Sequence, residues 1–232
     1  MIHKLYETFV SASLKNKKLL AILADPDVFN ISETKKFIKK LPKETSHIFV
    51  GGSTVEKGKT EKVVSEIKKN TSIPILLFPG DVSQITNNAD GLLFLSLLSG
   101  RNSEYLIGQQ VKSVSKLKNT TLEVISTGYL LIEGGTTSAV ERVSNTKPIL
   151  QKNIQLIIDT SVAGELLGSK LIYLEAGSGA KIPVDTSIIS AVKNAINIPL
   201  IVGGGIKTEK QKQEAYRAGA DLVVMGTAFE NK

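Results

Sequence analysis

PLIVGGGIKTEKQKQEAYRAGADLVVMGTA, residues 199–228, contains two short apolar runs that are each followed directly by glycine. The runs are Pro199–Val202 and Asp221–Met225, and a polar segment separates them. Continuous apolar runs of this length are typical of strands that are covered on both faces, as in a parallel sheet. We therefore interpret the stretch as two parallel strands joined by a crossover segment.

The same rhythm extends through the whole chain and predicts an α/β fold. Amphipathic stretches such as Glu33–Leu41 and Lys59–Asn70 lie between the apolar runs. Eight such units favour a single closed (β/α)₈ TIM-type barrel over an open doubly wound sheet. We expect one domain over residues 1–232, with a modified region between the fifth and sixth strands, because the spacing from Ser126 to Lys170 is uneven. The predicted strands are Leu19–Ala24, His47–Val50, Ile73–Phe78, Gly91–Ser96, Leu122–Ser126, Leu171–Glu175, Pro199–Val202 and Asp221–Met225.

Composition narrows the class of protein. Of 232 residues, 41% are hydrophobic and 22% charged, and cysteine is absent, which excludes disulfides and thiolate chemistry. No apolar run approaches the roughly 20 residues of a membrane span, and the first nine residues are too polar for a signal peptide, so we expect a cytoplasmic protein. The net charge of +7 favours anionic partners, which include phosphates, nucleic acid and an acidic membrane surface.

The two glycine loops at residues 203–205 and 226 predict a phosphate site. In a barrel, the loops after the seventh and eighth strands bind phosphate through backbone amides and a helix N-terminus. A side chain at Gly204, Gly205 or Gly226 would keep the amides away from the phosphate oxygens. Thr227 follows directly and is included in this site.

The first and second strands end in candidate metal ligands. Asp25-Pro26-Asp27 follows the first strand, and Gly51-Gly52-Ser53 follows the second. Mg²⁺ prefers one or two carboxylates together with hydroxyl, water or phosphate oxygens, so Asp25 with Ser53 is a candidate Mg²⁺ site. The alternative is a turn in which Asp27 caps the next helix.

The sixth strand ends in a candidate general base. Glu175 is followed at once by the flexible loop Gly177-Ser178-Gly179. A glutamate here can accept a proton from a substrate hydroxyl, and the loop can offer N–H groups to an anion. A structural glutamate that points into the barrel is the alternative reading. Tyr129 and Glu133 follow the predicted fifth strand and could line the same mouth, whereas the two histidines, at positions 3 and 47, have no metal-ligand spacing.

Taken together, these motifs resemble those of the geranylgeranylglyceryl phosphate synthases and their heptaprenyl relatives. The similarity covers nearly the whole chain, and the DPD turn paired with YLEAGSG is its most specific part. The motifs are Asp25-Pro26-Asp27, Gly51-Gly52-Ser53, Glu133-Gly134-Gly135-Thr136-Thr137-Ser138-Ala139-Val140, Tyr173-Leu174-Glu175-Ala176-Gly177-Ser178-Gly179, Gly203-Gly204-Gly205 and Gly226-Thr227.

The resemblance implies a Mg²⁺-dependent ether-forming prenyl transfer. The hydroxyl of sn-glycerol 1-phosphate would displace diphosphate from a polyprenyl diphosphate, here expected to be geranylgeranyl diphosphate, in ether phospholipid biosynthesis. Asp25 and Ser53 would hold Mg²⁺, Glu175 would take the proton, and Tyr173 would position the glycerol phosphate or face the allylic cation. The remaining residues assigned to substrate binding are Leu174, Ala176, Gly177, Ser178, Gly179, Gly204, Gly205, Gly226 and Thr227.

One position departs from the family pattern. Many relatives have lysine two residues before the first aspartate of the DPD turn, where this chain has Leu23. Lys57 and Arg101 are the candidates to replace that positive charge. The side chain that limits the length of the prenyl tail is expected near Leu98 to Tyr105.

Two other functions are compatible with parts of the pattern. A sugar-phosphate isomerase would share the glycine loops, but it gives no reason for the pair Asp25 and Ser53 beside an apolar groove. A basic module that binds nucleic acid or membrane would use the positive charge. Because aromatic residues are only 5% of the chain, we expect no nucleic-acid partner; we expect a homo-oligomer with at most transient contact with a membrane surface.

Overall fold

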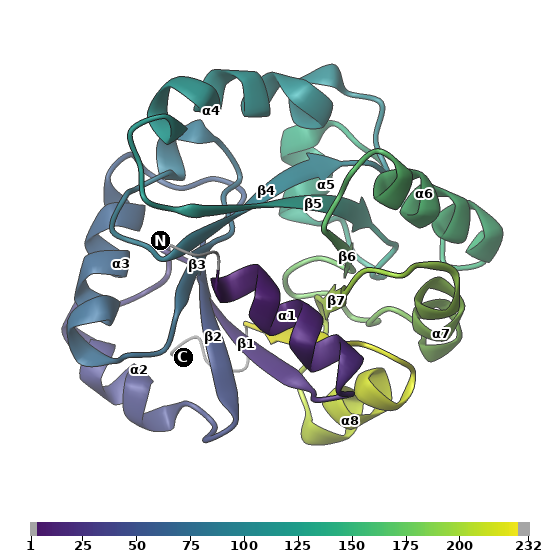
Figure 1. The fold of residues 1–232 in the computed structure, drawn as a ribbon, viewed down its shortest axis with the longest axis horizontal. Coiled ribbons are helices and arrows are strands. Elements are labelled where there is room, and N and C mark those ends of the chain that lie inside the picture. Colours follow the sequence, from purple (N-terminus) through teal and green to yellow (C-terminus); the bar gives the residue numbers. More distant parts are fainter. Residues whose placement is uncertain (1–3, 227–232) are drawn as a thin grey trace.

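A computed structural model describes residues 4–226, which form a closed barrel of eight parallel strands in sequential order (Figure 1). The predicted (β/α)₈ fold is confirmed, and the sixth strand has the predicted bounds. The strands are β1 Leu19–Ala24, β2 Thr45–Val50, β3 Ile75–Leu77, β4 Gly91–Leu97, β5 Glu123–Leu131, β6 Leu171–Glu175, β7 Leu200–Gly203 and β8 Leu222–Met225.

Helices surround the barrel, with one omission that the sequence did not predict. Between β3 and β4 the chain forms only the 3₁₀ turn η2, Val82–Gln84. The linking sequence Pro79–Asp90 contains Pro79-Gly80 and Asn87-Asn88, which favour turns over a helix. The α-helices are α1 Lys4–Leu14, α2 Thr34–Lys40, α3 Lys59–Asn70, α4 Gln109–Leu117, α5 Ala139–Ser144, α6 Ile154–Leu166, α7 Thr186–Ala195 and α8 Glu209–Arg217; η1, Ile31–Glu33, is a 3₁₀ turn and η3, Glu104–Gly108, is a π-helical turn.

Two apolar layers stabilise the barrel. Because successive strand residues point to opposite faces, Leu93, Ile125 and Tyr173 fill the interior, while Leu92 and Leu174 pack between the strands and the helices. Continuous apolar strands are what this double burial requires.

Helix α1 lies across one end of the barrel (Figure 1). Its Phe9 is buried in the interior layer and its ring centroid is 4.8 Å from that of His47. The carboxylate of Glu123, at the start of β5, accepts hydrogen bonds from the backbone N–H groups of Leu5 and Tyr6 at 2.8 and 2.9 Å. These contacts close the amino end of the barrel, and His47 is a buried core residue.

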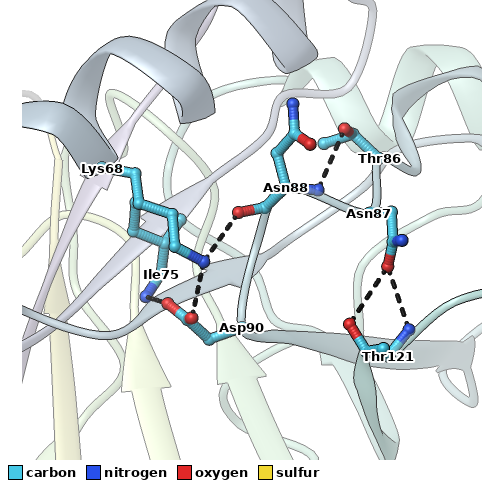
Figure 2. A network of polar contacts seen from close by, with 7 residues as sticks. All are labelled: Lys68, Ile75, Thr86, Asn87, Asn88, Asp90 and Thr121. Carbon is cyan, nitrogen blue, oxygen red and sulfur yellow. Dashed lines mark hydrogen bonds and ion pairs between the residues drawn. The ribbon is translucent and has the colours of Figure 1, made fainter.

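The segment that lacks a helix is fixed at this end by a polar network (Figure 2). Asp90 accepts hydrogen bonds from Ile75 N at 2.9 Å and from Lys68 Nζ at 2.8 Å. Lys68 Nζ also donates to the carbonyl of Asn88 at 3.0 Å, and Asn87 Oδ1 accepts from Thr121 N at 2.9 Å. The network holds the β3–β4 connection in place without a helix.

Strand β5 is longer than the sequence predicted. The expected strand ended at Ser126, but pairing with β4 continues to Tyr129 and pairing with β6 continues to Leu131. Thr127 and Gly128 therefore continue the strand, although they look like a turn in the sequence. As a result Tyr129 lies inside the barrel, and the expected modified region begins after Leu131 and contains α5.

Candidate active site

A cavity of about 450 Å³ opens at the carboxyl ends of the strands. This is the end at which barrel enzymes carry their active sites. The sequence-predicted residues that line it come from five different βα loops or strand ends. They are Asp25, Ser53, Tyr173, Glu175, Ser178, Gly179, Gly204, Gly205 and Gly226.

Glu175 ends β6 and is 6% exposed. Its Oε1 accepts a hydrogen bond from the backbone N–H of Gly177 at 2.7 Å. Burial raises the pKa of this carboxyl to about 7, although the Tyr173 hydroxyl and the Gly177 N–H both favour the ionised form. A carboxyl with a pKa near neutrality in a cavity is suited to proton transfer.

Gly203 and Gly204 make room for this carboxylate. A Cβ on Gly203 would overlap the Tyr173 hydroxyl and lie 3.0 Å from Oε2 of Glu175. A Cβ on Gly204 would overlap Oε1 of Glu175 and lie 2.5 Å from Gly177 N. Gly204 also has φ +77°, a conformation that favours glycine. The triple glycine therefore accommodates the glutamate as well as leaving backbone amides near the cavity.

An aromatic cluster lies beside the glutamate; Tyr129 and Tyr173 were expected at the mouth from the sequence, whereas Phe78 was not. Glu133, the other residue expected there after the fifth strand, does not line the cavity. Phe78 stacks on Tyr173 with ring centroids 5.2 Å apart, and Tyr129 contacts Tyr173 edge to face at 5.4 Å. The buried Tyr173 hydroxyl faces the Glu175 carboxylate closely enough to favour its ionised form, but its geometry is not that of a closed hydrogen bond. Burial raises the pKa of both tyrosines, so both hydroxyls stay protonated.

Four other predicted site residues do not line the cavity or lie outside the described range. The side chain of Leu174 packs outward because it alternates with Tyr173 and Glu175, and Ala176 packs in the same outer layer. The Gly177 N–H, expected to bind phosphate, donates to Glu175. Thr227 lies outside the described residues, so its contribution stays a prediction, as does any backbone contact from Leu174 or Ala176.

Asp25 and Ser53 lie at the side of the cavity formed by β1 and β2. Asp25 Oδ1 accepts the backbone N–H of Asp27 at 2.9 Å, and a Cβ on Gly52 would lie 2.8 Å from the same oxygen. The buried side chain of Gln84 holds Gly52 by two hydrogen bonds. Its Oε1 accepts the Gly52 N–H at 3.2 Å, and its Nε2 donates to the Gly52 carbonyl at 2.8 Å. The second strand's loop is thus fixed against Asp25.

The donor set at Asp25 fits Mg²⁺ bound jointly with a ligand. No group of three or more His, Cys, Asp or Glu side chains within residues 4–226 could hold a metal by itself. Mg²⁺ is usually held by one or two carboxylates, with substrate phosphates and waters completing the shell. Asp27 is less available, because its Oδ1 is 3.3 Å from Lys59 Nζ.

The cavity continues into an apolar arm where the helix after β3 is missing. Val82 and Ile85 from the β3–β4 connection line this arm together with Leu92 and Phe94 of β4. A full helix at this position would cover the outer face of β4. This arm is thus lined largely by apolar side chains, with Gln109 of α4 beside Val82.

The basic residues at the cavity differ from those expected. Lys57 and Arg101 do not line it, and an Arg101 side-chain N–H group donates to the carbonyl of Gly100 at 2.7 Å. Within the described range, Arg142 of α5 and Lys207 of the β7–α8 loop supply the cavity's positive charge. No local pattern marks Arg142 as a site residue, because it lies in the irregular region after β5.

Comparisons with known proteins agree with this geometry. The PcrB family model matches residues 13–232. A protein named geranylgeranylglyceryl phosphate synthase from Zunongwangia profunda is 58% identical over 98% of this chain and 97% of its own; one of the same name from Pyrococcus furiosus is 39% identical over 97% and 90%. The crystal structure of (S)-3-O-geranylgeranylglyceryl phosphate synthase from Thermoplasma acidophilum with its substrate sn-glycerol-1-phosphate has a TM-score of 0.91, with 31% identity over 100% of this chain and 93% of that one.

Proposed function

This chain belongs to the PcrB family, and we propose that it transfers a geranylgeranyl group from its diphosphate to sn-glycerol 1-phosphate, with Mg²⁺ and release of diphosphate. The relatives named geranylgeranylglyceryl phosphate synthase support the prenyltransferase role. The observation that carries the proposal is the cavity itself, which joins a buried glutamate, glycine loops and an apolar arm.

Each substrate has a matching part of the cavity. Glycerol 1-phosphate would bind at the loops of β7 and β8, with its phosphate near the backbone of Gly204, Gly205 and Gly226. The attacking hydroxyl would then lie near Glu175, which takes its proton as the new ether bond forms. Lys207, whose Nζ donates to Ala180 O at 3.0 Å, adds positive charge beside these loops.

The diphosphate and the prenyl tail would occupy the other side. Asp25 and Ser53 would hold Mg²⁺, which when bound neutralises charge on the departing diphosphate. The tail would lie in the apolar arm along β4. Burial of long apolar chains contributes about 0.8 kcal/mol per CH₂ group, so an arm of this kind favours a long prenyl chain.

A product assay tests this function directly. The purified protein is incubated with Mg²⁺, glycerol 1-phosphate and prenyl diphosphates of several lengths, and the products are identified by mass. We expect a prenylglyceryl phosphate, with the geranylgeranyl substrate giving the highest kcat/KM. The same assay with EDTA should give little product. If no prenyl diphosphate is consumed, the proposed function is wrong.

The phosphate site can be tested separately with Gly226→Ala. A Cβ here would make only ordinary contacts, the nearest being 3.4 Å from Leu23 Cβ, so the fold should tolerate it. The methyl group would separate the local amide from the phosphate, and loss of a charged hydrogen bond should raise the Kd for glycerol 1-phosphate roughly 10- to 100-fold. Titration calorimetry measures this change. Gly204→Val is a poorer test, because its Cβ would displace Glu175.

An unchanged Kd in Gly226→Ala would show that the phosphate binds elsewhere. The KM for the prenyl diphosphate serves as the internal control, since that substrate is assigned to the other side of the cavity.

A further inference from the structure

Phe78 connects the Asp25 side of the cavity with the Glu175 side through its contacts. Its backbone packs directly on Gly51, where a Cβ would overlap the Phe78 carbonyl. Gly51 precedes Gly52, which contacts the carboxylate of Asp25. On its other side, the Phe78 ring stacks on Tyr173 at 5.2 Å. A continuous set of contacts therefore leads from Asp25 through Phe78 to Tyr173.

Beyond Tyr173, these contacts reach Glu175, the proposed general base. The Tyr173 hydroxyl and Oε2 of Glu175 both approach the position where Gly203 lacks a side chain. If the diphosphate binds beside Asp25 and the glycerol hydroxyl beside Glu175, the allylic carbon that is transferred from one oxygen to the other lies between them. The Phe78 ring, which stacks on Tyr173, lines the cavity and could lie beside this carbon.

Phe78 also presents its ring to the cavity more openly than its two aromatic neighbours do. All three rings line the cavity, but Tyr173 is 0% exposed and Tyr129 is 5% exposed, whereas Phe78 is partly exposed. The stacked geometry, with an interplanar angle of 22°, covers one face of Tyr173 with Phe78. The ring available to a substrate is therefore that of Phe78, and this modifies the expectation that Tyr173 faces the allylic cation.

We propose that Phe78 is a catalytic residue whose ring stabilises the positive charge that develops on the allylic carbon; this inference rests on the proposed function. As the carbon–oxygen bond to diphosphate breaks, its electron pair leaves with the diphosphate. The glycerol oxygen forms the new bond to the same carbon, and its proton passes to Glu175. The charge on carbon exists only between these events.

An aromatic ring suits this task for two reasons. The face of its π-system attracts a cation, and the attraction is stronger where water is excluded. A ring also offers no lone pair that would capture the cation, unlike a carboxylate. Phe78 is fixed for this role, because its N–H donates to Val50 O at 2.9 Å and Tyr129 contacts the ring at 5.8 Å.

A pair of isosteric ligands tests the proposal without turnover. One carries a trimethylammonium group on the allylic carbon of a geranylgeranyl chain, and the other carries a neutral tert-butyl group. In the presence of Mg²⁺ and inorganic diphosphate, the wild-type protein should bind the ammonium ligand more tightly. Phe78→Leu should reduce this preference roughly 5- to 30-fold, and Phe78→Tyr should keep it.

Two control measurements distinguish a weaker attraction for the cation from a change in the shape of the cavity. The affinity of the neutral ligand reports on packing, and the Kd for glycerol 1-phosphate reports on the rest of the site. If Phe78→Leu does not fold, stepwise fluorination of the Phe78 ring weakens the π-face while nearly keeping its shape, and the preference should fall with each fluorine. An equal preference in wild type and Phe78→Leu, or no effect of fluorination, would overturn the proposal. The wild-type product assay tests the proposed function independently.

Discussion

Asp25→Asn should lower Mg²⁺-dependent turnover by roughly 10²- to 10⁴-fold, because several kcal/mol of charge stabilisation at the leaving diphosphate would be lost. The asparagine carbonyl can still accept the N–H of Asp27, so the turn should be preserved. The substitution therefore removes the negative charge and little else. Steady-state kinetics over a Mg²⁺ titration measure the loss.

The binding of glycerol 1-phosphate should stay nearly unchanged in this variant, since that substrate is assigned to the β7 and β8 loops. Asp27→Asn is the matched control, because the Asp27 carboxylate is engaged by Lys59 at 3.3 Å. It should cost much less activity than Asp25→Asn. Full turnover in Asp25→Asn would make Asp25 a turn residue and place the metal elsewhere.

The strands could be predicted because double burial leaves a direct trace in the sequence. Leu171–Glu175 is uniformly apolar up to the glutamate, and its bounds agree with β6. The predicted end of β5 was wrong because Thr127-Gly128 is a common turn composition. In the structure Gly128 continues the strand and gives room to the side chains of Leu98 and Ile172. The turn-forming pairs Pro79-Gly80 and Asn87-Asn88 are a local sign that no helix follows β3, but the contact between Lys68 and Asp90 that holds this segment is tertiary and leaves no local pattern.

The site residues likewise divide into those that the sequence predicts and those that only the structure reveals. Asp25, Glu175 and the glycines could be predicted because they follow strands at the carboxyl end of a barrel, where position alone suggests a role. Tyr129 was expected at the mouth because it follows an apolar run, but Phe78 was not identified, since an aromatic residue inside an apolar run looks the same whether it fills a core or lines a cavity. Only the arrangement of the rings around Tyr173 separates the two cases.

Glu175→Gln should lower kcat roughly 10²- to 10⁴-fold, which is the usual contribution of general-base catalysis. The glutamine keeps the size of the side chain, and its carbonyl can accept the N–H of Gly177. The affinity for the prenyl diphosphate should change little. Glu133→Gln is a matched control, because Glu133 is exposed and does not line the cavity.

The pH dependence of the two proteins distinguishes a base from a residue that only orients the glycerol. Because burial raises the pKa of Glu175 to about 7, the free wild-type enzyme carries the ionised, proton-accepting form mainly above that pH. Its kcat/KM should therefore rise as pH increases through about 7 and level off above it, and this limb should be absent in Glu175→Gln. If Glu175 also holds the glycerol by hydrogen bonds, the KM for glycerol 1-phosphate rises in the variant as well. A folded Gln variant with wild-type turnover and the same pH profile would show that another group, the departing diphosphate itself, accepts the proton.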